Sequence, residues 1–242
     1  MIVNVLTGLA LLAGPAAADP VIGAPELTHN ELYKKGRLAK IKCSLDKGTS
    51  KASTEKYVKN LVGCLNKAWG PLIPEYEDVD VKFLKNPKGT CTGIEFKDSF
   101  IDLCYDVDVR LANDWIKAKD DLAIQIQFAG AFAGVIQGQT GIGRAYSALP
   151  NNGDEKLLDE HRRRFGYQQD CLAGATMKAL GRTAKNWKPL LRAEAPNPVD
   201  EGYRKHWHSK VTKNELHWFT RGYQAGSPKA CNTWKAAESK VS

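Results

Sequence analysis

Residues 121–137 read Asp-Leu-Ala-Ile-Gln-Ile-Gln-Phe-Ala-Gly-Ala-Phe-Ala-Gly-Val-Ile-Gln, with no charged side chain after Asp121. The stretch is long enough for a helix and carries apolar groups on more than one face, which predicts a buried helix. Gly130 and Gly134 lie in its middle, where each costs about 1 kcal/mol of helix stability relative to Ala. We therefore expect this helix to form the centre of the protein, and its two glycines to be present for a reason other than helix propensity.

On the N-terminal side of this helix, residues 52–69 predict an amphipathic helix that ends at Gly70-Pro71. Its apolar stripe consists of Tyr57, Leu61, Cys64, Leu65 and Trp69. Alternating apolar and charged residues then predict a small sheet. Its strands are expected at Val79–Phe83, Gly93–Phe96 and Phe100–Val109.

On the C-terminal side, a glycine-rich break over 138–143 and a loop at 149–154 lead to a second long helix at Lys156–Leu180. Pro189 and Pro196-Asn197-Pro198 indicate a surface connection, and Val211–Trp234 predicts a helix followed by a docked tail. Before all these elements, Thr28 and Glu31 have the spacing of a capping box that would start a short helix or turn.

The composition is that of an ordinary globular protein, with 242 residues, 43% hydrophobic and 26% charged. The net charge of +8 suits an anionic partner such as a cell-wall polymer or lipid head groups. No recognisable nucleic-acid module accompanies the charge, so we expect no specific nucleic-acid binding.

The first 18 residues carry no charged side chain, and their apolar stretch ends in Ala16-Ala17-Ala18, a run that suits signal peptidase. We expect residues 1–18 to be a signal peptide, 19–30 an extended arm and 31–242 a single domain. An apolar stretch of about ten residues is too short to span a bilayer, and we expect no transmembrane segment in the mature chain. The predicted location is secreted, either extracellular or associated with the cell envelope.

Six cysteines fit an exported chain, because an even number can pair completely under oxidising conditions. Sequence alone leaves many pairings open. We favour pairing between neighbours along the chain, which gives Cys43 with Cys64, Cys91 with Cys104, and Cys171 with Cys231.

Several segments in this order resemble the bacterial neutral zinc metallopeptidase family, which carries an H-E-x-x-H motif on a helix. They are Leu32-Tyr33 with Cys43, Cys64 to Trp69, Cys91 with Cys104-Tyr105, Gln168 to Gly174, and His217 through Gly222-Tyr223 to Trp234. The resemblance covers most of the mature chain. It implies an α+β, helical, zincin-type domain with a small N-terminal sheet, stapled by disulfides.

The resemblance fails at the catalytic motif. Two His four apart on a helix bind zinc from one side while the Glu between them activates the metal-bound water. When the chain is aligned on Gln137 and Asp170-Cys171, the two His positions fall on Gly130 and Gly134, the catalytic Glu on Ala131 and the third ligand on Gly166. None of these four has a side-chain donor atom, so the zinc that the family binds has no ligands here and we expect no cofactor.

Other residues could in principle rebuild a site. His206, His208 and His217 form a cluster that could hold a metal, but neighbouring Lys and Arg disfavour a cation, so a solvated or aromatic-packed surface is the preferred interpretation. His29 suggests no role, and His161 beside Arg162-Arg163-Arg164 is interpreted as part of a solvated charged face. Cys171 is expected in a disulfide rather than as a nucleophile, and Asp170 as a residue that once supported the metal.

These observations predict a non-catalytic binding or scaffolding protein of the cell envelope, with an unidentified protein, peptide or anionic wall polymer as partner. They also predict that the former metal cavity has collapsed into core packing, unless the glycines leave a slot that binds something else. The alternative function is an active hydrolase or metallopeptidase whose ligands lie outside the aligned motif. Whether the chain is an enzyme is therefore left open by the sequence.

Overall fold

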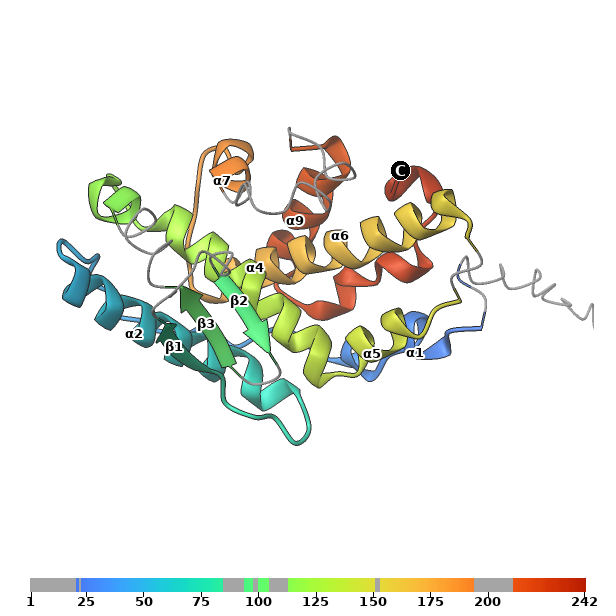
Figure 1. Cartoon of the computed structure of the whole chain (residues 1–242), viewed down its shortest axis with the longest axis horizontal. Helices are drawn as coiled ribbons and strands as arrows, with labels where there is room; N and C mark the ends of the chain where they lie inside the picture. The colour runs from blue at the N-terminus through green and yellow to red at the C-terminus, as the bar shows by residue number, and fades with distance from the viewer. Residues whose placement is uncertain are drawn as a thin grey trace, which may run out of the picture.

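The computed structural model describes residues 21, 23–84, 94–97, 100–104, 113–150, 153–193 and 211–242 of the chain. Its described part is mostly helical, with one small sheet (Figure 1). Helix α4 (Leu122–Gln139) runs between the sheet and the long helix α6 (Glu155–Ala179). The coarse expectation of a helical α+β protein is confirmed.

Helix α4 is buried on nearly every side, as its uncharged sequence predicts. Ile124, Phe128, Phe132 and Ile136 are each at most 1% exposed. At the N-terminal end, the buried carboxylate of Asp121 accepts hydrogen bonds from Tyr57, Gln125 and Arg182, which come from three different segments.

Helix α2 (Lys51–Trp69) buries the predicted stripe, because all five of its members are inaccessible to solvent. Its N-terminus is closed by a capping box between Ser50 and Ser53. Near its C-terminal end, the Asn66 side chain donates to the carbonyl of Val79 and accepts from the amide of Val79, at 2.9 and 3.0 Å. This amide pairing fixes the start of the sheet against α2.

The sheet has the order β1-β3-β2, with β1 (Asp80–Leu84), β2 (Ile94–Lys97) and β3 (Phe100–Cys104). The central strand β3 runs parallel to β1, with Asp80 opposite Phe100, and antiparallel to β2, with Ile94 opposite Leu103. All three strands were predicted from alternation, and the part of the third strand expected over 105–109 lies outside the described residues.

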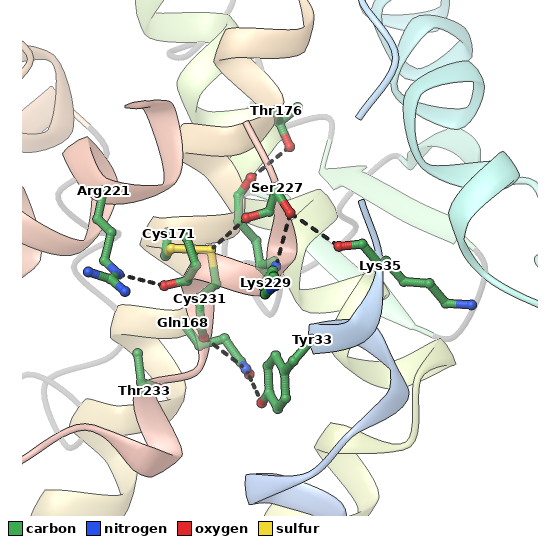
Figure 2. Close-up of a disulfide and its surroundings, with 12 residues drawn as sticks. Tyr33, Lys35, Gln168, Cys171, Thr176, Arg221, Ser227, Lys229, Cys231 and Thr233 are labelled. Atoms are coloured by element: carbon green, nitrogen blue, oxygen red, sulfur yellow. Dashed lines mark hydrogen bonds between the residues drawn. A yellow bond between two sulfur atoms is a disulfide. The ribbon is translucent and has the colours of Figure 1, made fainter. Parts of the chain in front are cut away.

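Helices α6 and α9 (Lys213–Ala225) make the closest helix contact in the described chain. A Cβ on Gly174 would lie 2.9 Å from the amide nitrogen of Tyr223, and a Cβ on Gly222 would lie 2.7 Å from the carbonyl carbon of Cys171. Real Cβ atoms do not approach backbone so closely, so both positions require glycine. The Cys171–Cys231 disulfide, with Cα atoms 5.4 Å apart, fastens the same crossing (Figure 2).

The predicted pairing of cysteines that are neighbours along the chain is confirmed for the two pairs that the structure describes. Cys43 pairs with Cys64 and Cys171 with Cys231. The expected Cys91–Cys104 pair lies outside the described residues, because Cys91 is not among them and nothing is described of the Cys104 side chain.

The N-terminal expectations need correction. The arm expected to be extended contains a helical turn, α1 (Pro25–Thr28), whose Leu27 is fully buried. Pro25 at the first position favours this turn, and burial of Leu27 holds it in place. The following turn, η1 (Glu31–Lys34), is capped by Asn30 and not by Thr28, whose hydroxyl pairs with His29. The predicted signal peptide, residues 1–18, lies outside the described part.

Two short helices were not predicted. Helix α5 (Ile142–Ser147) follows the glycine-rich break, with Gly141 in the left-handed conformation, φ 76°, at its start. Helix α7 (Lys188–Ala193) contains Pro189, which had indicated only a connection. After α9 the chain continues through three short 3-10 turns, η3 (Pro228–Cys231), η4 (Thr233–Lys235) and η5 (Glu238–Lys240), which form the predicted docked tail.

Among the helices described, none combines the length and hydrophobicity that crossing a membrane requires.

We expect Gly222→Ala to lower the free energy of unfolding by about 1–3 kcal/mol, because the new methyl group would force α6 and α9 apart. The matched control is Gly63→Ala in the middle of α2, where an added Cβ meets nothing within 4 Å. There the substitution should raise stability by up to about 1 kcal/mol through helix propensity. Urea denaturation of both variants measures the difference, and equal shifts in the same direction would contradict the close crossing.

Candidate functional site

The four motif positions lie on the two central helices. Gly130, Ala131 and Gly134 are on α4, and Gly166 is on α6. Gly134 and Gly166 are buried, whereas Gly130 and Ala131 are partly exposed. Gly130 and Gly134 share one face of α4 because they are four residues apart.

Hydrogen bonds fix how these two helices meet. The Gln137 amide donates to the carbonyl of Phe165 at 3.1 Å and to the Gln168 side chain at 2.7 Å. At the other end, Asp121 before α4 pairs with Arg182 after α6, so the helices are antiparallel. Gln137 is one turn from Gly134, and Phe165 is next to Gly166. Both glycines therefore lie within about one turn of the same crossing.

The side chains at this crossing provide no chemistry for a metallopeptidase. Glycine and alanine offer no atom that could bind zinc or take a proton from water. Within the described ranges, no three His, Cys, Asp or Glu side chains are grouped so that they could hold a metal ion. Asp170, one turn beyond Gly166 on α6, is half-buried.

A buried chain of amides and a phenol runs beside the glycines instead. Gln168 donates from Nε2 to the Tyr33 hydroxyl at 2.6 Å, and Tyr33 donates to the Leu27 carbonyl at 3.0 Å. Burial raises the pKa of Tyr33, which keeps the phenol protonated and able to donate. Gln168 also reaches the Cys231 carbonyl, as Figure 2 shows. The network thus connects α4, α6, η1 and η3.

The sequence pointed to Gln137 and Gln168 only as marks of the resemblance. Their burial could have been inferred from Gln137, because an amide in an otherwise apolar helix requires a partner on a neighbouring element. The partner itself could not have been identified, because the two glutamines are 31 residues apart in sequence.

The interpretation of residues 161–164 as a solvated face was wrong for His161 and Arg164, whereas Arg162 and Arg163 are partly exposed. His161 is 5% exposed and Arg164 is fully buried. The Arg164 guanidinium pairs with Glu160 and donates to the carbonyls of Thr233 and Ala236, at 2.5 and 2.9 Å. The C-terminal tail supplies these carbonyls and covers this part of α6.

The remaining candidates are not brought together into a site. His217 lies half-buried on α9, with its ring edge against Trp218 at a centroid distance of 5.5 Å. His206 and His208, its expected companions, lie outside the described residues. Cys171 is in a disulfide and therefore not a nucleophile.

Comparison of the chain with protein-family models, with curated proteins and with solved structures found no match. The family resemblance therefore remains a prediction that depends on the residues quoted above.

The collapse of the former metal cavity can be tested at Gly134. If α6 packs directly on this position, Gly134→Ala lowers the free energy of unfolding by about 1–3 kcal/mol, because the methyl group has no room. Gly138→Ala on the same helix is the control, since an added Cβ there meets nothing within 4 Å. It should be neutral or stabilising by up to about 1 kcal/mol. Thermal unfolding of both variants distinguishes collapse from an open slot, in which Gly134→Ala would stabilise as well.

Proposed function

We propose that this chain is a non-catalytic binding or scaffolding protein of the cell envelope, built on the frame of a zincin-type neutral zinc metallopeptidase. The observation that carries the proposal is the α4–α6 crossing. The motif positions lie there on two antiparallel helices, and each carries hydrogen or a methyl group as its side chain. A fold whose motif positions have no side-chain atom that could bind zinc suits a binding protein better than a hydrolase.

The relation between the helices supports the choice of frame. In an H-E-x-x-H peptidase of this kind, the second helix brings a third ligand to the two His of the first. The Gln137 bond to Phe165 brings Gly166 to within about one turn of the crossing near Gly134.

The compartment follows from the cysteines and the N-terminal residues. Paired Cys43–Cys64 and Cys171–Cys231 suit an oxidising environment. Together with the expected signal peptide they support export. A net charge of +8 in an exported protein suits a peptide or an anionic wall polymer as partner, through an attraction that weakens as salt is added.

We expect the purified mature protein to contain close to zero zinc after brief exposure to stoichiometric zinc and dialysis, because no ligand remains at the motif positions. Elemental mass spectrometry measures the metal, and digestion of an unfolded protein substrate measures peptidase activity. Both should be at background, and any affinity tag that contains histidine must be removed first.

About one tightly held zinc per chain would overturn the proposal and favour a metallopeptidase with ligands outside the motif. The matched variant is then His206→Ala with His208→Ala. Loss of zinc in that variant would locate the new site in the histidine cluster, whereas retention would point to ligands elsewhere in the chain.

A further inference from the structure

Residues 232–242, named here the C-terminal strap, follow the disulfide-bonded Cys231 and contain the turns η4 and η5. The strap lies along α6 and α9 (Figure 1). Three of its side chains, Thr233, Trp234 and Val241, are fully buried. The disulfide fixes Cys231, the residue before the strap, to α6, and the strap itself is attached by noncovalent contacts.

Backbone carbonyls of the strap are the principal attachment points. Arg164 donates to the carbonyls of Thr233 and Ala236, and Arg163 donates to that of Val241 at 2.7 Å. On the other side, the Trp218 indole of α9 donates to the Lys240 carbonyl at 2.8 Å. Attachment therefore depends on cationic and aromatic donors of α6 and α9 facing a strap that is itself basic at Lys235 and Lys240.

Every histidine in the described part of the chain lies at this strap. The His161 ring packs against Trp234, with centroids 6.3 Å apart. His29 lies 2.8 Å from the Lys235 ammonium through Nε2. His217 packs edgewise on Trp218, the residue that holds the Lys240 carbonyl. Three elements, α1, α6 and α9, thus each present one imidazole to the strap or to its anchoring residue.

His161 is placed where an added proton is unfavourable. His161 is buried, its Nδ1 has no hydrogen-bond partner, and Arg164 is one turn away on the same helix. A proton on His161 therefore places a positive charge near Arg164 and weakens the contacts around Trp234.

The pKa values agree with this geometry. Burial lowers the pKa of His161, with a smaller opposing effect of the Glu160 carboxylate and a further lowering by Arg164. Burial also lowers the pKa of His217, and Lys240, Arg221 and Lys213 lower it further. A base whose pKa is lower in the folded state contributes stability that is complete above its unfolded value, near 6.5, and is lost as the pH falls through the folded value.

Other charged groups surround the strap on the elements packed against it. They are Glu26 on α1, Arg144 on α5, Asp159, Glu160, Arg162, Arg163 and Arg164 on α6, Lys213, Glu215 and Arg221 on α9, and Lys235, Glu238 and Lys240 in the strap itself. Histidine is the side-chain type whose ordinary charge change falls between about pH 5 and 8, so acidification from about pH 7.5 to 5 addresses the imidazoles at the strap.

We propose that the C-terminal strap is an acid-released element, docked on α6 and α9 at neutral pH and detached when His161 and His217 become protonated. The Cys171–Cys231 disulfide holds the residue before the strap on α6, so a detached strap stays close to its docking surface and release is reversible. Detachment uncovers the surface that Trp234 occupies, including the stacked rings of Tyr146 on α5 and Phe165 on α6. The inference does not depend on the proposed function.

Hydrogen exchange of the intact protein, followed by mass spectrometry, tests the proposal. Exchange is compared at about pH 7.5 and 5, after correction for the intrinsic chemical rate of the unfolded chain. We expect protection of residues 232–242 to fall at least about tenfold on acidification, the equivalent of one pKa unit, while α4 stays protected. The triple variant His29→Gln, His161→Phe, His217→Gln should change less than about twofold.

A strap that remains protected at pH 5 in the wild type would overturn the proposal. Equal loss of protection in the triple variant would also overturn it, because the effect would then come from carboxylates. Simultaneous loss of protection in α4 would overturn it as well, because that result indicates global acid unfolding. If the triple variant does not fold, Lys235→Met with Lys240→Met provides the second test. Removing these two cations should move the release midpoint to lower pH, and an unchanged midpoint contradicts the mechanism.

Discussion

The contact between α6 and α9 is the constraint on which most of the structure depends. Its closeness requires glycine at 174 and at 222, and the disulfide from Cys171 to Cys231 fixes it from one side. Because the two helices touch through backbone atoms, the crossing offers little freedom to slide or rotate. Everything that the C-terminal third of the chain contacts is positioned from this junction, including the tail that covers Arg164 and the carbonyl of Cys231 that receives Gln168.

The central helix α4 is fixed at both of its ends by buried polar side chains. In this chain α4 is held at one end by the buried carboxylate of Asp121 and at the other by the Gln137 amide. Both attachments are buried polar networks that span several elements, and in each of them one amide oxygen, Gln125 Oε1 or Gln137 Oε1, accepts no hydrogen bond. The two helices therefore keep their relation through hydrogen bonds and apolar burial, and the glycines between them need supply no ligand.

The sequence predicts well the elements whose pattern is long and local. The stripe of α2, the uncharged α4 and the length of α6 follow from periodicity, and the two disulfides follow from order along the chain. It fails for α5 and α7, which have six residues each and too little pattern to distinguish them from loops. The prediction for His161 and Arg164 failed for another reason, because a tail about 70 residues away in sequence covers Arg164 and accepts its hydrogen bonds. At the site, the sequence placed the four motif positions, but it did not reveal the network of Gln137, Gln168 and Tyr33.

The buried Arg164 and the neutral histidines around the strap belong to one physical arrangement. A guanidinium taken out of water must be given acceptors, and the strap provides two carbonyls in addition to the carboxylate of Glu160. The strap is also held by its buried Trp234 and by further hydrogen bonds, among them Thr233 Oγ1 to the Arg164 carbonyl at 2.6 Å and Asn214 Nδ2 to the Ser242 carbonyl at 2.7 Å. Positive charge added beside Arg164 and the strap's own lysines opposes this docking. Because Cys231 is anchored, the detached strap stays at a high effective concentration beside its binding surface, and redocking requires closure of only a short segment. A covalent anchor next to a charge-sensitive attachment lets a small change in protonation open one part of the molecule while the glycine crossing holds the rest.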